Sequence, residues 1–480
     1  MTKILEQIRK GLAYFEENNF SKAEATFLNL IRMSPTNQQI YGYLIPVLIK
    51  QKKFKDALKF SERLINLDKN GELGLIYMGI INYNLMKYSL ALNYFERSLI
   101  INSKNIDALV NIGVTHRKLG DNAKAKKYLE KSSEINNNKS IVFYNLGSIY
   151  EEEADFEKAI MFFEKAIAIN EKDYESIHAL SLCQLTMQYY KDGLRNYEFR
   201  WFKSGFEKYR YQNIDKLETI NFISGKKVLI WYEQGLGDTI QFSRYVSLLI
   251  DLGGEVTFEV QKPLKSFLSR QFDCEITEEA SNKSFDYQCP LMSLPNLFGL
   301  NIENIPKLNK YFKCDNQRFD FWKNTLPFSN NKKNIGIAIS GNVNHINEYR
   351  RRINLEYLMP LTKNFKIFII QKNLDHKDEI LLNKSNDIVF LGKEKQWTDF
   401  EDTSAIVQNM DYIVSIDTSL IHLSSSMNKK TFLLLSKPAD WRWSHEELNE
   451  PNWYNNMTVI RQKNRNNWHE VIEELQAKLI

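Results

Sequence analysis

Two short motifs, distant from each other in the chain, combine residue types that could do chemistry. The first is Gly235-Leu236-Gly237-Asp238, which follows a buried apolar run at residues 227–231. Its glycines permit a tight loop that would present the carboxylate of Asp238 to a cleft, where a carboxylate can transfer protons. The third glycine of a dinucleotide fingerprint is replaced by Ile240, so a nicotinamide or flavin site is not expected. The alternative is that Asp238 only caps the helix that begins at Thr239.

The second motif is Asp417-Thr418-Ser419, with His422 in the next turn. It follows a buried strand and opens a helix, so free backbone N–H groups and the positive end of the helix dipole would suit a diphosphate. Asp417 would repel a phosphate, and we expect it to bind a substrate hydroxyl or the helix start. A protonated His422 could contact phosphate; alternatively, it is a packed core residue.

Cationic and amide side chains follow two further predicted strands. Arginine suits a diphosphate clamp, because its guanidinium matches phosphate oxygens bidentately and stays charged. Within Arg350-Arg351-Arg352 we expect one or two side chains to reach the ligand, favouring Arg350 and Arg352 for their place in the motif; a solvated charge run is the alternative. Trp397 could stack on a base, although we expect it to pack. The residues expected at the anionic ligand are Ser340, Gly341, Asn342, Arg350, Arg352, Gln371, Lys372, Asp417, Thr418, Ser419 and His422.

No metal cofactor is expected. The chain has no D-x-D pair and no H-E-x-x-H motif, so it lacks these carboxylate and histidine spacings of metal sites. The charge of an anionic leaving group would then be met by arginine and by the helix dipole. The cysteines form no C-x-x-C pair, which argues against zinc and against a disulfide framework and fits a reducing compartment; they are Cys183, Cys274, Cys289 and Cys314.

Two series of apolar runs alternating with amphipathic helices must position these motifs. The first series has strands predicted at residues 227–231, 255–260 and 287–289. A polar stretch at 329–334 precedes the second, with strands predicted at 335–340, 367–371, 388–391, 412–416 and 431–435. This order predicts two parallel α/β lobes, over residues 222–328 and 334–480, with a cleft where the carboxyl ends of both sheets meet.

The region before these lobes carries an internal repeat. A small residue recurs every 34 positions, six times in succession: Ala23, Ala57, Ala91, Ala125, Ala159 and Gly193. This period predicts an α-solenoid of about six helical hairpins over residues 1–207, and it resembles a tetratricopeptide array. Such arrays have a concave face that holds a protein or peptide. Asn111 and Asn145 share a repeat position, and their amides could grip a peptide backbone there or merely make that face soluble.

Composition limits the possible partners. The 480-residue chain has a net charge of +5 and no basic block dense enough to indicate nucleic acid. No apolar run approaches membrane-spanning length, and the charged N-terminus lacks the apolar core of a signal peptide. We therefore expect a cytoplasmic protein, or one that is peripheral at the inner face of the membrane.

Residues 233–242 and 415–423 resemble two signatures of bacterial lipopolysaccharide heptosyltransferases and of the family 9-like glycosyltransferases built around them. The match is closest to the branch in which a tetratricopeptide array precedes the transferase, whose members also have segments similar to Ser340-Gly341-Asn342 and Trp441-Arg442-Trp443. The resemblance covers about residues 1–470. The order of parts is also similar to that of protein O-linked N-acetylglucosamine transferases.

The resemblance implies a GT-B fold of two Rossmann-like lobes and a metal-independent, inverting glycosyltransferase. A nucleotide-sugar would be the donor and a protein or glycan hydroxyl the acceptor, with the repeats recruiting the acceptor or a partner. Asp238 matches the family's general base. Gln234, Gly235 and Gly237 match the family's loop on the acceptor side. The last helix would return to the first lobe, fastened by rings such as Trp453. The alternative is a non-catalytic tetratricopeptide scaffold with a degenerate transferase domain; the donor sugar, acceptor and oligomeric state stay open.

Overall fold

The computed structural model describes residues 2–69, 71–206, 208–280, 283–307, 311–343, 347–382 and 385–479. The chain divides into two compact units, residues 1–176 and 177–480. The outer bounds expected for the domains, at residues 1, 207 and 480, lie outside the described residues. Within the described ranges, none of the helices is both long and apolar enough to cross a membrane.

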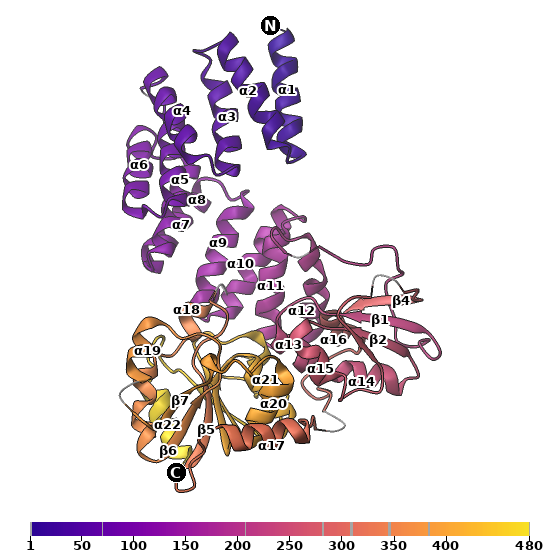
Figure 1. The fold of residues 1–480 in the computed structure, drawn as a ribbon. Helices are drawn as coiled ribbons and strands as arrows, with labels where there is room; N and C mark the ends of the chain where they lie inside the picture. The colour runs from indigo at the N-terminus through magenta and orange to yellow at the C-terminus, as the bar shows by residue number, and fades with distance from the viewer. Residues whose placement is uncertain are drawn as a thin grey trace. The chain divides into compact units, whose positions relative to one another are not determined.

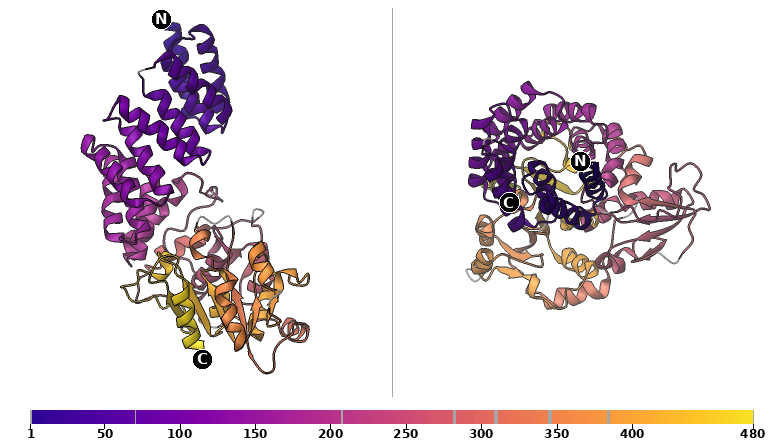
Figure 2. Two further views of the ribbon diagram at one scale, coloured as in Figure 1. Left: turned by 90° about the vertical axis from the view of Figure 1, so that its left-hand side faces the viewer. Right: turned by 90° about the horizontal axis from the view of Figure 1, so that it is seen from above.

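The first unit is a stack of helical hairpins, in which each helix packs against the next along the chain (Figure 1). Seen from above, its helices curve into a superhelical turn (Figure 2). The helices are α1 (Thr2–Glu16), α2 (Phe20–Met33), α3 (Gln38–Lys50), α4 (Phe54–Leu67), α5 (Leu73–Asn84), α6 (Tyr88–Ile101), α7 (Ile106–Lys118), α8 (Asn122–Ile135), α9 (Ser140–Glu152) and α10 (Phe156–Ile169).

Small residues let the two helices of a hairpin approach closely. The repeated alanines from Ala23 to Ala159 have no exposed surface. Gly147 leaves room for Phe163 on the partner helix, because a Cβ at Gly147 would lie 2.8 Å from that ring. The turn inside each hairpin also recurs every 34 residues, with a positive φ at Asn18, Lys52, Met86, Gly120, Ala154 and Gln188. The repeat predicted from the sequence is therefore a helical solenoid in the structure.

The second unit opens with a last helical hairpin, formed by α11 (Tyr174–Thr186), which begins at the end of the first unit, and α12 (Tyr190–Tyr197), followed by the 3₁₀ helix η1 (Glu198–Phe202). Its residues Leu185 and Leu194 belong to the same hydrophobic core as Val228 of the sheet that follows. This hairpin is thus built into the α/β unit.

The first lobe contains a parallel sheet of four described strands in the order β3-β2-β1-β4. In its two central and neighbouring strands β1 and β2 every residue after the first is buried, as parallel sheets covered by helices require, and β1 is also apolar over those residues. The strands are β1 (Lys227–Trp231), β2 (Glu255–Glu259), β3 (Glu275–Thr277) and β4 (Tyr287–Pro290), and the helices are α13 (Leu236–Phe242), α14 (Arg244–Asp251), α15 (Lys265–Leu268) and α16 (Leu294–Leu297), with short 3₁₀ turns η2 (Lys262–Leu264) and η3 (Leu291–Ser293).

The second lobe contains a parallel sheet whose described strands run in the order β10-β9-β8-β5-β6-β7. The strands are β5 (Lys333–Ala338), β6 (Phe365–Ile369), β7 (Ile388–Phe390), β8 (Tyr412–Ile416), β9 (Thr431–Leu435) and β10 (Met457–Arg461). The α-helices are α17 (Asn316–Thr325), α18 (Glu348–Arg351), α19 (His376–Leu382), α20 (Phe400–Asn409), α21 (Ser419–Ser426) and α22 (His469–Leu479), and the 3₁₀ helices are η4 (Leu355–Lys363), η5 (Leu391–Lys393) and η6 (Trp441–Trp443).

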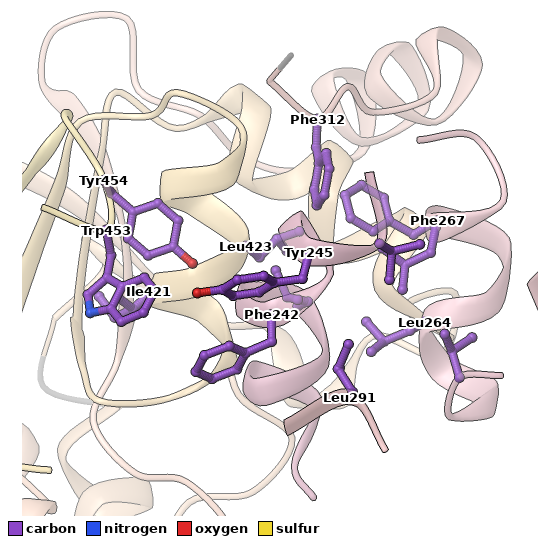
Figure 3. Close-up of a cluster of buried hydrophobic side chains, with 14 of the residues drawn as sticks. Phe242, Tyr245, Leu264, Phe267, Leu291, Phe312, Ile421, Leu423, Trp453 and Tyr454 are labelled. Atoms are coloured by element: carbon purple, nitrogen blue, oxygen red, sulfur yellow. The ribbon is translucent and has the colours of Figure 1, made fainter. Parts of the chain in front are cut away.

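The last helix does not return to the first lobe, which corrects the expectation from the family. Val471 and Leu475 of α22 pack in the core of the second lobe with Ile335 and Ile367 of its sheet. The segment before β10 makes the crossing instead. Trp453 packs edge-on against Phe242 of α13, with ring centroids 5.7 Å apart (Figure 3).

Candidate functional site

The two motifs singled out in the sequence lie against each other. β1 belongs to the parallel sheet of the first lobe, and β8 belongs to that of the second. α13 begins shortly after the carboxyl end of β1, and α21 begins shortly after that of β8. The two helices pack together. Gly237 is the point of closest approach: a Cβ there would lie 2.9 Å from Cδ2 of His422 and 3.3 Å from Cα of Ser419. Any other residue at this position would have to displace the buried His422 ring or the start of α21.

Asp238 is held by one contact from each lobe. Its Oδ2 accepts a hydrogen bond from the backbone N–H of Gly235 at 2.9 Å, and its Oδ1 forms an ion pair with Nη2 of Arg442. Its side chain remains 21% exposed. The helix begins at Leu236 and not at Thr239, so Asp238 lies in its first turn instead of preceding it. Asp238 caps the helix from that position, through the N–H of Gly235, and it also contacts the other lobe.

Arg442 connects three parts of the site. Its Nη1 donates to Oδ1 of Asp440 at 2.8 Å, and its guanidinium lies over the rings of Trp441 and Phe242. Burial opposes its charge, but Asp238 and Asp440 outweigh this and raise the pKa of Arg442. It is therefore a permanent cation at this position. In the sequence, its Trp-Arg-Trp segment stood out only through the family resemblance, which gave Arg442 no role.

Asp417 lies at the end of β8, next to the start of α21. Burial and the neighbouring carboxylate of Asp440 raise the pKa of Asp417 to about 6, although Arg442 and Arg351 oppose the shift. Its side chain thus changes charge near neutral pH rather than near pH 4. Thr418 caps α21 by accepting a hydrogen bond from the N–H of Leu420 at 3.4 Å.

His422 is a buried neutral residue. Its Nδ1 shares a hydrogen bond of 3.1 Å with the hydroxyl of Tyr454, its ring stacks with Trp443, and its Nε2 lies 3.9 Å from Oδ1 of Asp417. Burial, Arg442 and Arg244 lower its pKa well below the usual value. The expectation of a protonated His422 at a phosphate is therefore wrong; the neutral ring packs between Asp417 and Tyr454.

The arginine run is arranged differently from the expectation. Arg350 bonds the hydroxyl of its neighbour Tyr349 at 2.8 Å, and Arg352 is paired with Asp375 and Asp378. It is Arg351 that reaches the second motif, because its Nη1 donates to the backbone oxygen of Asp417 at 2.8 Å. The preference for Arg350 and Arg352 was based on motif position, which does not reveal the direction of a side chain.

The loop after β5 is fixed by Gln371. The Oε1 of Gln371 accepts hydrogen bonds from the N–H groups of Ile339 and Ser340, and its Nε2 donates to the hydroxyl of Ser340 at 2.8 Å. Gly341 N donates to Glu348 at 2.7 Å, and Asn342 follows on the exposed side of this loop. Gln371 therefore shapes the loop instead of offering a free amide.

Lys372 and Trp397 pack together. The Lys372 ammonium lies 3.8 Å from the centre of the Trp397 ring and bonds the backbone oxygen of that residue. Burial lowers the pKa of Lys372, and the Trp397 indole N–H donates to Thr403 at 2.8 Å. These contacts account for both side chains without a ligand.

The amides expected to line the repeat groove are engaged within the array. Asn111 and Asn145 each donate to the backbone oxygen four residues earlier, at 2.7 Å. Asn145 is 4% exposed and also accepts from Arg117. Asn145 therefore does not present a free amide to a peptide, whereas Asn111 is half-buried.

Among the residues that the structure describes, no group of three or more His, Cys, Asp or Glu side chains is placed to hold a metal ion. No disulfide joins the four cysteines, all of which the structure describes. One fully buried ion pair that the sequence analysis missed, between Arg200 and Glu233, lies directly before the first motif. Its charge types were visible in the sequence, but their contact depends on the fold.

Comparison with known proteins identifies the repeats. The family model described as tetratricopeptide repeat matches residues 104–172. No curated protein sequence matches the chain. Among solved structures, the chain is similar to the thermophilic TPR protein TTC0263 of Thermus thermophilus, at 15% identity over 38% of this chain and 99% of that one, with a TM-score of 0.36.

Two further solved structures are similar to this chain over a comparable share of its length. PilF of Pseudomonas aeruginosa is 16% identical over 40% of this chain and 88% of its own length, with a TM-score of 0.34. MamA of Desulfovibrio magneticus RS-1, from residue 41 onward, is 20% identical over 34% of this chain and 91% of that chain, with a TM-score of 0.29. The chain thus contains tetratricopeptide repeats, followed by an α/β region with two parallel sheets.

Proposed function

We propose that the α/β region is a GT-B glycosyltransferase. It transfers a sugar from a nucleotide-sugar donor to a hydroxyl of a protein or glycan, with inversion and without a metal, and the repeats recruit the acceptor or a partner protein. The observation that carries this proposal is the contact between the two motifs, in which Gly237 lies against Ser419 and His422. Asp238 follows Gly237 in the chain, so it belongs to the helical turn of the first lobe that contacts the start of α21 in the second.

Asp238 would accept the proton of the attacking hydroxyl. Each carboxylate oxygen has about two lone pairs, so the hydrogen bonds from Gly235 and Arg442 leave acceptor capacity on both oxygens. These two donors also fix the carboxylate in one orientation, which general-base catalysis requires. Direct displacement by that hydroxyl would invert the anomeric carbon.

The leaving nucleoside diphosphate would lie at the start of α21. Backbone N–H groups in the first turn of a helix lack intrahelical partners, and the helix dipole favours an anion there. Arg351 contributes a positive charge at the same place through its contact with the Asp417 backbone. A protonated Asp417 would remove the repulsion that a carboxylate exerts on phosphate.

The alternative function is a tetratricopeptide scaffold without turnover. The matched repeats favour protein binding by themselves, and the ion pair with Arg442 gives Asp238 a structural partner. A panel of nucleotide-sugars in a thermal-shift assay separates the two. A ligand that binds only the folded protein raises the melting temperature, and a scaffold would show no shift with any donor.

The decisive variant is Asp238→Asn, compared with Asp273→Asn, which changes an exposed acid of the same lobe. We expect the first to lower turnover by about a hundredfold or more, the usual contribution of a general base, and to leave donor binding intact. The second should retain full activity. Equal turnover in both variants would remove Asp238 from the mechanism.

A further inference from the structure

The ion pair between Arg200 and Glu233 is entirely buried. Both side chains have no exposed surface, and the guanidinium binds the carboxylate bidentately, with Nε to Oε2 at 2.7 Å and Nη2 to Oε1 at 2.9 Å. The backbone N–H of Met292 also donates to Glu233. The remaining guanidinium contacts go to Tyr197 O, Glu198 and Ser293.

A second contact joins the same two segments. The Gln234 amide donates to the hydroxyl of Tyr197, which ends α12, and Gln261 donates to the backbone oxygen of Gln234 at 2.8 Å. Glu233 and Gln234 are consecutive residues of the loop between β1 and α13. Asp238 lies in the first turn of α13, directly after this short loop.

Buried ion pairs are a poor device for stability alone, because desolvation opposes their attraction and a hydrophobic pair often stabilises as well. The hydrogen bonds of a bidentate ion pair do, however, hold the two side chains in one orientation. Arg200 immediately follows the last helical hairpin, so this hairpin holds the start of the loop that leads to α13 and Asp238. Gly235 is the last residue of this loop, and a glycine restrains the backbone less than any other residue does.

From these contacts we propose that Arg200 and Tyr197 are positioning residues for Asp238. The last hairpin of the repeat region acts as a part of the catalytic half, since it fixes the loop in the conformation that brings Gly237 against α21. The inference rests on the proposed function for the role of Asp238. Whether the hairpin restrains the loop can be measured without an activity assay.

Two substitutions in the full chain test it. Tyr197→Phe removes one hydroxyl, and Arg200→Lys keeps the charge but cannot bind bidentately. The matched controls are Tyr189→Phe, an exposed tyrosine of the same hairpin, and Arg195→Lys, whose partner Asp192 is a surface residue. Hydrogen exchange is followed in peptides covering residues 233–242, with those covering β1 as reference, and kcat and KM are measured for the transfer reaction.

We expect exchange in residues 233–242 to rise at least about fivefold in both test variants, with β1 unchanged, and kcat to fall about tenfold while the donor KM stays within twofold. The controls should match the wild type. If Arg200→Lys raises exchange in β1 as well, the test of the proposal is the exchange measured in Tyr197→Phe. Unchanged exchange in Tyr197→Phe would overturn the proposal. If the wild type transfers no sugar, the proposed function fails, and the exchange data still decide whether the hairpin restrains the loop.

Discussion

The guanidinium of Arg351 donates a hydrogen bond to the backbone oxygen of Asp417, over 2.8 Å. The same side chain forms an ion pair of 2.7 Å with Glu348, whose other oxygen accepts from the N–H of Gly341. A Cβ at Gly341 would lie 2.5 Å from the Arg351 nitrogen Nη2, so the glycine makes room for the arginine. Arg351 thus ties the loop after β5 to the start of α21.

This relationship predicts that Arg351→Ala weakens binding of a free nucleoside diphosphate by about tenfold, which corresponds to about 1.4 kcal/mol for one lost charge-assisted contact. Isothermal titration calorimetry measures the affinity. Arg350→Ala is the matched control, because Arg350 contacts only its neighbour Tyr349 among its described bonds. Weaker binding in Arg350→Ala and not in Arg351→Ala would locate the cation of the clamp elsewhere.

The sequence was sufficient for much of the fold because its signals are periodic. Small residues at a spacing of 34 predicted the hairpins, and apolar runs predicted β1, β8 and β9 at the observed bounds. β3 and β10 were not predicted. β3 has three residues, and β10 is an edge strand whose residues are mostly half-buried, so neither forms a continuous apolar run.

The sequence was less informative about the site, because side-chain direction and long-range contacts have no local signature. Arg350, Arg351 and Arg352 are three consecutive residues of the same type, and the sequence does not distinguish them. Of the three, Arg351 is the one that bonds Asp417 at the start of α21. Arg442 pairs with an acid that lies 204 positions away in the chain. Resemblance to a family located the motifs, but it gave no information on these partners.

Packing in the first unit predicts opposite effects for two helical glycines. Gly147→Ala should destabilise the array by about 1 to 3 kcal/mol, since the new methyl would lie 2.8 Å from the buried Phe163 ring. Gly42→Ala should be neutral or stabilise by up to about 1 kcal/mol, because its nearest neighbour, Leu73, would lie at 3.4 Å and alanine favours the helix. Thermal melts followed by circular dichroism compare the variants. Equal melting temperatures would contradict the close approach at Gly147.

The charge on Asp417 predicts a pH dependence of anion binding. Its pKa of about 6, raised by burial and Asp440, means that the carboxyl is neutral below pH 6 and negative above it. A negative charge beside the diphosphate should weaken binding by about tenfold between pH 5 and pH 7. Asp417→Asn is the reference, since it retains the titration of the ligand itself. The same slope in both proteins would mean that Asp417 does not face the anion.

His178 predicts a pH dependence of stability in the second unit. Burial, Lys203 and Arg200 lower its pKa to about 4, and its ring packs against Tyr197 and Phe206. In the unfolded chain the pKa is about 6.5, so between pH 6.5 and pH 4 the unfolded state binds more protons. The contribution of His178 to the free energy of unfolding is therefore complete above pH 6.5. As the pH falls, this contribution, which is at most about 3 kcal/mol, is lost.

Asp417 works in the opposite direction, because its raised pKa stabilises the folded state as pH falls from about 6 toward 4. The wild-type melting temperature alone would mix the two effects. The difference between His178→Gln and the wild type isolates the histidine: the variant should gain relative stability as pH falls from 6.5 to 4, and the two curves should run parallel above pH 7. Parallel curves over the whole range would mean that His178 is protonated as readily in the folded protein as in the unfolded chain.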